Sequence, residues 1–168
     1  MRDKELYTHI LAIRSPWEVG DVELSVGAGE VKVFVEQEAG AEQCCPKCGA
    51  VCRGYDRRRR EWRHLDTCQI KTILVADVPR VECPEHGVVT VKVPWAEPGS
   101  GFTALFEALV IDWLKEASTL AVSRQMKLSW NAIDGIMPRA FNRGLKRRAV
   151  HAPRQIGVDE TPFRKRHD

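Results

Sequence analysis

Apolar and polar residues alternate through the first third of the chain. In the stretch DVELSVGAGEVKVFVEQ, every second residue is apolar on either side of the small-residue triplet at 27–29. Period-two alternation around a short glycine-containing turn predicts a β-hairpin. The segments 61–82 and 88–95 are rich in β-branched residues and predict further strands. The stretch AEPGSG at 96–101 predicts a turn or linker.

The pattern becomes helical after Gly101. FTALFEALVIDWLKEAS places apolar residues at i, i+3 and i+4 spacing, and Thr103 is a candidate helix cap. Two shorter helices are expected on either side of 127–129, and a basic run after Pro138 predicts further helix as far as Ala149. The whole pattern predicts an α+β protein with a β-rich domain at 1–96, a helical domain at 102–150 and the start of a third domain at 155–168.

The overall charge says little about partners, because the 168 residues carry a net charge of only +3. The distribution of charge is more informative, since basic residues gather in two clusters that are candidate phosphate contacts. A solvated charged face is the alternative interpretation of either cluster. The first cluster is Arg57, Arg58, Arg59, Arg60 and Arg63, and the second is Arg139, Arg143, Lys146, Arg147, Arg148 and Arg154.

Nothing in the sequence indicates a membrane protein. No apolar run approaches the roughly 20 residues that a membrane span needs, and the first residues lack the apolar core of a signal peptide. We therefore expect a cytoplasmic protein. In that compartment the six cysteines are better explained as metal ligands or free thiols than as disulfides.

Two knuckle-like motifs have the spacing of a zinc site. CPKCG supplies Cys45 and Cys48, and CPEHG supplies Cys83 and His86. In each motif the two intervening residues and the following glycine let both side chains reach one ion. A Cys3His set fills all four positions of a tetrahedral zinc, so we expect a structural ion that also adds folding free energy to a small β-rich unit. Free thiols in two coincidental turns are the alternative.

Three further cysteines and one histidine are weaker candidates for the metal site. Cys44 neighbours a ligand and could exchange with Cys45, whereas Cys52 has less regular spacing. Cys68 lies in a predicted β region and is expected to be a small buried residue. His64 is a fifth candidate ligand, although a hydrogen-bonded histidine is the favoured interpretation.

The segment 118–137 has the pattern of a helix-turn-helix. Ser123 is small where the two helices would approach each other, and Ser129 is a candidate N-cap for the second helix. Two features weaken the match, because Lys127 occupies a turn position that suits glycine and Pro138 would kink or end the helix. The residues expected to be buried are Val122, Met126, Leu128, Ile133, Ile136 and Met137.

The exposed side of the second helix carries residues that can contact DNA. Asn can read adenine, and Arg can contact guanine or phosphate in the major groove. The candidates are Trp130, Asn131, Asp134 and Arg139. Three-helix packing without DNA contact is the alternative, but the preceding zinc motif and the following basic run favour DNA binding.

The order of these motifs resembles a known family. The blocks CPKCG, GYDRRRREWRHLDTC, VPRVECPEHGVVTVKVPWAEPGSGFT, LSW and IGVDE are similar to bacterial insertion-sequence transposases of the IS-L-three family, over nearly the whole chain. The resemblance implies a zinc ribbon, a helix-turn-helix and the start of a DDE catalytic domain of ribonuclease H-like fold. It also implies that Cys45, Cys48, Cys83 and His86 bind zinc. Asp159, in GVDE, would be the first catalytic carboxylate.

The resemblance implies double-stranded DNA as the partner, recognised at the terminal inverted repeats of the element. The full-length transposase and a second copy of this chain are further candidate partners, and association with the nucleoid is expected. DDE chemistry uses two Mg²⁺ ions held by several carboxylates. Only Asp159 is present, so Mg²⁺ is expected only in a complete catalytic domain, and this chain, which we take as truncated, is not expected to be an enzyme. A regulator retained by the host and a non-functional remnant are the alternatives.

Overall fold

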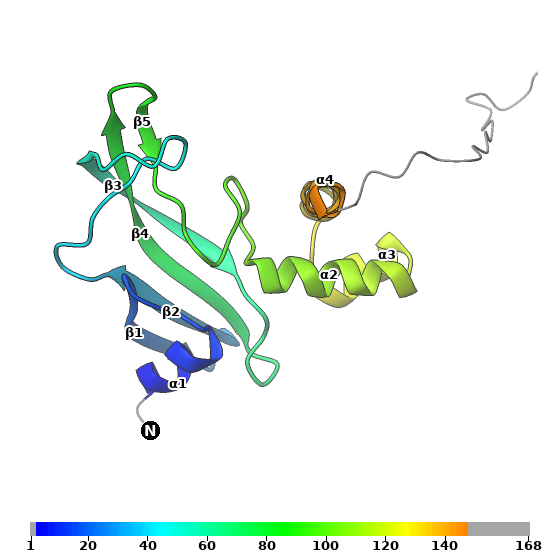
Figure 1. The fold of residues 1–168 in the computed structure, drawn as a ribbon. Coiled ribbons are helices and arrows are strands. Elements are labelled where there is room, and N and C mark those ends of the chain that lie inside the picture. Colours follow the sequence, from blue (N-terminus) through cyan, green and yellow to red (C-terminus); the bar gives the residue numbers. More distant parts are fainter. Residues whose placement is uncertain (1–2, 148–168) are drawn as a thin grey trace, which may run out of the picture.

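The computed structural model describes residues 3–147, and Figure 1 shows a β-sheet with a group of helices beside it. Asp159 and Arg148, with the whole segment 155–168, lie outside the described residues. The helices are α1 (Asp3–Ile10), α2 (Ala104–Glu116), α3 (Thr119–Met126) and α4 (Trp130–Arg147). The strands are β1 (Trp17–Ser25), β2 (Glu30–Gln37), β3 (Arg53–Arg63), β4 (Lys71–Cys83) and β5 (Gly87–Thr90).

The sheet is organised around β4. Strand β3 pairs with it antiparallel along one edge. The other edge is shared, because β2 runs parallel to residues 71–76 and β5 pairs antiparallel with residues 80–83. Strand β1 is antiparallel to β2, so the predicted hairpin is confirmed. Gly29 adopts a φ of +61° in the hairpin turn, a left-handed conformation that suits glycine.

The alternating pattern buries one face of the hairpin. Val31, Val33 and Val35 of β2 are each no more than 2% exposed. They belong to one apolar core with Trp62 of β3 and Leu74 of β4. Period-two alternation thus places the β-branched side chains of β2 against the other strands.

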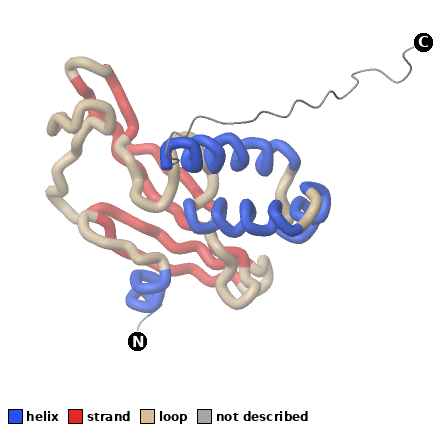
Figure 2. The backbone as a smooth tube through the Cα atoms, turned by 45° about the vertical axis from the view of Figure 1, so that its right-hand side comes forward, coloured by secondary structure: helices blue, strands red, loops and turns tan. Residues whose placement is uncertain are grey.

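The helices α2, α3 and α4 have a separate apolar core. Its fully buried members are Phe106, Val110, Val122, Ile133 and Ile136, each no more than 1% exposed. Thr103 caps α2, because its Oγ1 accepts a hydrogen bond from the backbone N–H of Phe106 at 3.3 Å. Figure 2 shows α2 and α4 side by side, joined at one end through α3. The expectation of a helical region after residue 101 is therefore confirmed.

The end of β3 attaches the helices to the sheet. The backbone N–H of Arg63 donates to the carbonyl of Gly101 at 2.9 Å, and its carbonyl accepts from the N–H of Thr103 at 3.0 Å. The N–H of Ala104 donates to the carbonyl of Trp95 at 2.8 Å. These bonds fix the first turn of α2 against the last residues of β3 and the linker.

Several expectations about the elements differ from the structure. Helix α1 was not predicted, because Tyr7 is its single buried residue and so short a helix then has no apolar stripe to show in the sequence. The strand expected at 88–95 ends at Thr90, and prolines follow at positions 94 and 98. Pro138 lies inside α4 and does not end it. Ile136 before the proline and Arg139 after it both hold α4 against α2. These contacts keep the helix continuous although Pro138 has no backbone N–H to donate.

Two side-chain expectations were also wrong. Met137 was expected in the buried stripe of α4 but is 48% exposed, because it lies at the edge of that stripe, about 100° around the helix from Ile136. Cys68 was expected to be buried in a strand. It is exposed instead, in the turn between β3 and β4, where its φ is +51°.

Candidate metal centre and nucleic-acid interface

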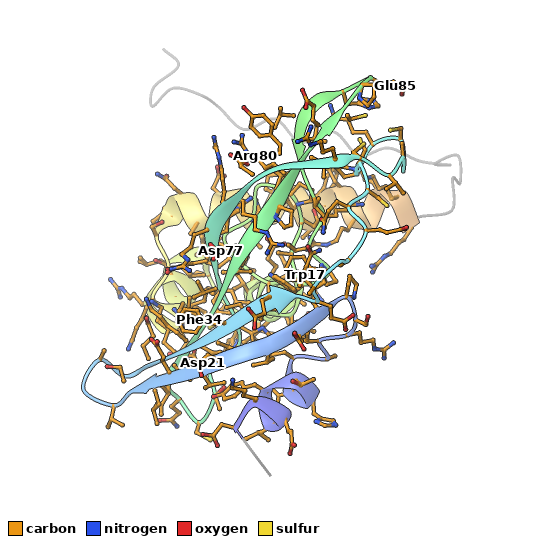
Figure 3. The ribbon with its side chains drawn as sticks, turned by 90° about the vertical axis from the view of Figure 1, so that its left-hand side faces the viewer. Trp17, Asp21, Phe34, Asp77, Arg80 and Glu85 are labelled. Atoms are coloured by element: carbon orange, nitrogen blue, oxygen red, sulfur yellow. The ribbon has the colours of Figure 1, made fainter. Side chains whose placement is uncertain are left out.

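The predicted metal ligands meet at one end of the sheet, and they are Cys45, Cys48, Cys83 and His86. The first pair lies in the loop between β2 and β3, and the second pair spans the turn of the β4–β5 hairpin. Glu85, labelled in Figure 3, marks the tip of that hairpin. Left-handed glycines close both knuckles, with φ of +76° at Gly49 and +65° at Gly87.

The four ligand atoms have the separations of a tetrahedral zinc site, and all lie within 4.8 Å of one another. Sγ of Cys48 is 3.7 Å from Sγ of Cys83, and Nδ1 of His86 is 3.5 Å from Sγ of Cys83 and 3.7 Å from Sγ of Cys45. Zn–S bonds of about 2.3 Å and a Zn–N bond of about 2.05 Å give separations of about 3.8 Å between sulfurs and about 3.6 Å from sulfur to nitrogen. The residues therefore fit a structural zinc held through Nδ1 of His86.

Crowding of the side chains perturbs the thiols of this cluster. A hydrogen bond with His86 lowers the pKa of Cys83 to about 6. The Ala50 backbone lowers the pKa of Cys48, but hydrogen bonding to Cys45, burial and hydrogen bonding to Cys83 outweigh it and raise that pKa to about 11. The neighbouring thiols thus oppose the ionisation of Cys48, and a divalent cation would supply the charge that lets all of them bind as thiolates.

The weaker metal candidates are not among the four grouped ligands, although burial raises the pKa of Cys52 and the Cys83 thiol lies close enough to raise it further. Among residues 3–147 the grouped ligands include neither Cys44 nor Cys52. The thiol of Cys52 donates instead to the carbonyl of Ala50 at 3.3 Å. His64 is 5% exposed, and its Nδ1 shares a 2.9 Å hydrogen bond with Oγ1 of Thr103. The interpretation of His64 as a hydrogen-bonded histidine is therefore confirmed.

Helices α3 and α4 form a helix-turn-helix with a tightly bonded turn. Lys127 adopts the left-handed conformation that such turns require, with φ of +52° and ψ of +47°. The hydroxyl of Ser123 donates to the carbonyl of Leu128 at 2.7 Å. Oγ of Ser129 accepts from the backbone N–H of Ala132 at 3.2 Å, as the predicted N-cap should.

A buried carboxylate holds α4 against α2. Glu107 of α2 is 1% exposed, and its Oε1 accepts from Nε of Arg139 at 2.7 Å and from the hydroxyl of Ser100 at 2.8 Å. Its Oε2 accepts from a guanidinium nitrogen of Arg143 at 2.9 Å. The same nitrogen of Arg143 donates to Glu97 in the linker at 2.6 Å. This network sets the position of the candidate recognition helix, and the sequence pattern gave no indication of it.

The first basic cluster does not form one continuous patch. Alternation along β3 places Arg57 and Arg59 on one face of the sheet and Arg58 and Arg60 on the other. The guanidinium of Arg59 donates to both carboxylate oxygens of Asp77, at 3.0 and 3.1 Å. The position of Asp77 on the sheet is labelled in Figure 3. Four adjacent arginines in sequence are therefore separated in space.

The last two members of that cluster have structural contacts. The guanidinium of Arg60 lies 5.4 Å from the ring of Trp62, and that of Arg63 lies 5.1 Å from the ring of Phe106 and pairs with Asp66 at 2.9 Å. Within residues 3–147, the side chains of Arg57 and Arg58 are the members without a hydrogen bond or ion pair. The predicted DNA contacts of all five stay predictions.

The candidates on α4 fall into two groups. Trp130 is 60% exposed, and Asn131, Lys146 and Arg147 are also exposed. The remaining described candidates, Arg139 and Arg143, are bound to Glu107, so each has a structural role whether or not it contacts DNA. Arg148 and Arg154 lie outside the described residues.

Two exposed cations beside the turn were not among the predicted DNA contacts. Arg124 near the end of α3 and Lys127 in the turn are exposed, and the described residues offer their side chains no ion pair. They flank the first turn of α4, which carries Asn131. The sequence could have indicated these two residues only through their position next to the candidate recognition helix, because they belong to no basic run.

A Cys3His knuckle pair on a sheet, followed by a three-helix unit with a helix-turn-helix, defines a DNA-binding protein of the zinc-ribbon and helix-turn-helix class. Two family models match these regions. "Zinc-finger of transposase IS204/IS1001/IS1096/IS1165" matches residues 41–86, and "Helix-turn-helix domain of transposase family ISL3" matches residues 91–140.

Curated relatives agree with these family matches. The chain is 33% identical to "Transposase for insertion sequence element IS1557" from two strains of Mycobacterium tuberculosis, CDC 1551 and H37Rv, and each match covers 99% of this chain and 39% of the relative. The chain belongs to the ISL3 family of transposases, the IS-L-three family that its sequence resembles. No solved structure matches it. Within the described part of the chain, no helix has the length and hydropathy needed to cross a bilayer.

Proposed function

We propose that this chain is the DNA-binding region of an insertion-sequence transposase and that it recognises the terminal inverted repeats of its element. The observation that carries the proposal is the α3–turn–α4 motif, whose first α4 turn presents Asn131 and Trp130 to solvent. The unpaired cations Arg124 and Lys127 beside this turn suit the flanking phosphates. In this proposal the Cys3His cluster binds a structural zinc and takes no part in chemistry.

The test is binding to labelled duplexes that carry an element end, compared with duplexes of scrambled sequence, across a series of salt concentrations. We expect tighter binding to the element end, and a logarithmic salt slope of about −0.9 for each phosphate neutralised. A flat salt response, or equal affinity for both duplexes, would contradict the proposal. Purified zinc-loaded protein should be used, because zinc knuckles depend on their metal for folding.

A matched pair of asparagine variants tests the orientation of α4. Asn131 and Asn142 are both exposed on this helix, but only Asn131 lies in its first turn. We expect Asn131→Ala to lose about 1–3 kcal/mol of discrimination between the two duplexes, the value of one good base contact. Asn142→Ala should bind as the unaltered chain does. Equal losses would place the DNA elsewhere on the molecule.

We also propose that this 168-residue polypeptide does not itself cut DNA. Two-metal phosphoryl transfer needs several carboxylates around two Mg²⁺ ions, and the family resemblance assigns only Asp159 to that role here. The chain spans 39% of the length of its curated relatives, so the activity of a complete transposase is a proposal for a longer protein. Cleavage of inverted-repeat DNA by the pure chain with Mg²⁺ would contradict this.

A further inference from the structure

A cleft of about 430 Å³ lies on the sheet beside the metal cluster. Trp62 of β3 and Val78 of β4 line it from the sheet side and are 2% and 1% exposed. Its other walls come from the first knuckle, the end of β5 and the segment between β5 and α2. Such a volume is within the range of about 300–1,000 Å³ that is typical of small-molecule sites. The apolar residues of these walls are Pro46, Val89, Val91, Val93, Ala96 and Pro98.

Three cations border this apolar cleft. They are Lys47 of the first knuckle, Arg60 of β3 and Lys92 of the segment after β5. Lys47 and Lys92 are exposed, and the described residues offer neither of them an ion pair. Glu97 is the one carboxylate among the described lining residues, and it is already bound to Arg143 at 2.6 Å. The cleft therefore has an excess of positive charge beside apolar walls, which suits an anion with an apolar body.

The guanidinium of Arg60 is held in position at this cleft. It lies 5.4 Å from the ring centre of Trp62 and donates to the carbonyl of Ser100 at 3.3 Å. Guanidinium planes stack on the bases of nucleic acids, and a side chain that is already ordered loses little entropy when it binds. A nucleobase therefore suits Arg60 and the apolar walls, while its phosphate suits Lys47 and Lys92.

A base has to be unpaired to enter such a cleft, because the planar faces of a paired base are covered by its neighbours in the duplex. An acidic peptide with apolar side chains would match the charge and the walls. The fixed guanidinium of Arg60 favours the nucleotide, since every base offers it a planar face.

The cleft is joined to the candidate recognition helix through one ion pair. Glu97 lies in the wall of the cleft and accepts from Arg143 of α4. Arg143 follows Asn131 by twelve residues, which is about 18 Å along the helix. One turn of B-DNA is about 34 Å long, so a single turn of duplex is long enough to span from Asn131 to the wall of the cleft.

We propose that this cleft binds an unpaired nucleotide that adjoins the duplex contacted by α4. The inference rests on the proposed function, because the nucleotide belongs to the same DNA. It adds a second site on the sheet, which distinguishes a frayed or single-stranded terminus from a fully paired one. The helix-turn-helix reads paired bases and does not make that distinction.

The experiment compares the binding of three labelled element-end duplexes to the full zinc-loaded chain. One duplex is blunt, and the other two carry three unpaired thymidines on the 3′ or on the 5′ strand of the terminus. We expect one of the overhangs to tighten binding at least about fivefold, which is the lower limit for one stacked base. The same overhang built from abasic residues is the matched control. It keeps the phosphates but has no bases, so the gain should disappear.

Variants of the cleft residues test where the unpaired base binds. Lys47→Gln combined with Lys92→Gln should remove most of the gain, and Arg60→Lys should reduce it because lysine keeps the charge but has no stacking plane. Lys71→Gln combined with Lys115→Gln is the control, since both lysines are exposed and lie outside the cleft. The zinc content and helical content of each variant confirm that it folds.

Photocrosslinking is a second measurement that needs no variant. An overhang that contains 5-iodouracil should cross-link to residues 60–62 or 89–99. Cross-links to the first turn of α4 would overturn the inference, as would a gain that the abasic overhang reproduces or that the control lysine pair removes equally. Specific binding to the blunt duplex with no gain from either overhang would overturn this inference and leave the proposed function intact. Loss of binding to every duplex would overturn both.

Discussion

Glu107 is the residue on which the helical unit most depends. It is 1% exposed and accepts hydrogen bonds from two guanidinium groups, so its removal would leave Arg139 and Arg143 without their shared counter-charge. Breaking one side of a buried ion pair costs about 3–5 kcal/mol. We therefore expect Glu107→Ala to lower the free energy of unfolding by about that amount in urea titrations.

The control for this prediction is Glu116→Ala, since Glu116 is an exposed carboxylate on the same helix. Its free energy of unfolding should stay within about 0.5 kcal/mol of the unaltered chain. If both variants unfold at the same urea concentration, the Glu107 network does not stabilise the helical unit. DNA binding by Glu107→Ala would then show separately whether the position of α4 matters for recognition.

His64 makes the junction between sheet and helices sensitive to acid. Burial lowers the pKa of this histidine below its ordinary value of 6.5. At a pH between the folded and unfolded pKa values, the unfolded chain binds a proton that the folded chain does not. The contribution of His64 to stability is therefore complete above pH 6.5 and is lost as the pH falls below that value.

The measurement is urea unfolding at a series of pH values for the unaltered chain and for His64→Gln, which can bond to Thr103 but does not titrate. We expect the unaltered chain to lose its advantage in free energy of unfolding over His64→Gln as the pH falls below 6.5. The loss should be no more than about 1.4 kcal/mol per pH unit, the limit for one proton. Because the cysteines titrate in both proteins, their effect cancels in the difference. Parallel pH curves would show that His64 is already solvated in the folded state.

At the scale of single elements, the turn of the helix-turn-helix stores a small strain. Lys127 has a Cβ atom in the left-handed region, at a cost of about 1–2 kcal/mol that glycine avoids. Glycine loses about 0.5–1 kcal/mol through its larger freedom in the unfolded chain. We expect Lys127→Gly to raise the free energy of unfolding by up to about 1.5 kcal/mol in urea titrations.

Lys127→Ala separates the backbone effect from the loss of the side chain, because alanine keeps the Cβ atom. In the same urea titrations, the free energy of unfolding of Lys127→Ala should not exceed that of the unaltered chain. If the alanine variant is as stable as the glycine variant, the left-handed backbone at this position is not strained and the lysine side chain itself is unfavourable.

Elements with local signals were the ones that the sequence predicted well. The hairpin of β1 and β2 shows its buried face as alternation, and the caps Thr103 and Ser129 mark helix starts within a few residues. Strand β3 gives no such signal, because most of its residues are exposed and its pairing comes from contact with β4. Its arginines read as one basic cluster, although alternation divides them between two faces.

The residues of the two sites also differ in how well local sequence patterns predict them. Four candidate metal ligands could be identified because each knuckle is a short local motif, and folding only had to bring two motifs together. The Glu107 network joins residues 32 and 36 positions apart, and a glutamate on a helix otherwise suggests a solvent-exposed side chain. Contacts of that kind depend on how α4 packs against α2, which local patterns do not encode.

At the scale of the whole molecule, the metal centre and the helix-turn-helix lie at different ends of β3 and β4 (Figure 1). Each is attached to different elements of the fold. The metal cluster joins the β2–β3 loop to the β4–β5 hairpin, whereas the helices are attached where β3 ends, at Arg63. The helical core has its own buried residues and includes no metal ligand. Loss of zinc should therefore act first on the knuckles.

We expect a strong chelator to remove one zinc per chain and to speed hydrogen exchange in residues 45–52 and 83–90 far more than in α2 to α4. The reason is that zinc supplies much of the folding free energy of a knuckle, while the helices retain their apolar core and the Glu107 network. Cys48→Ser should reproduce the exchange pattern of the chelated protein, and Cys68→Ser, which changes an exposed thiol outside the cluster, should not. Equal loss of protection in α4 would mean that the metal centre and the recognition helix unfold as one unit, and that DNA binding depends directly on zinc.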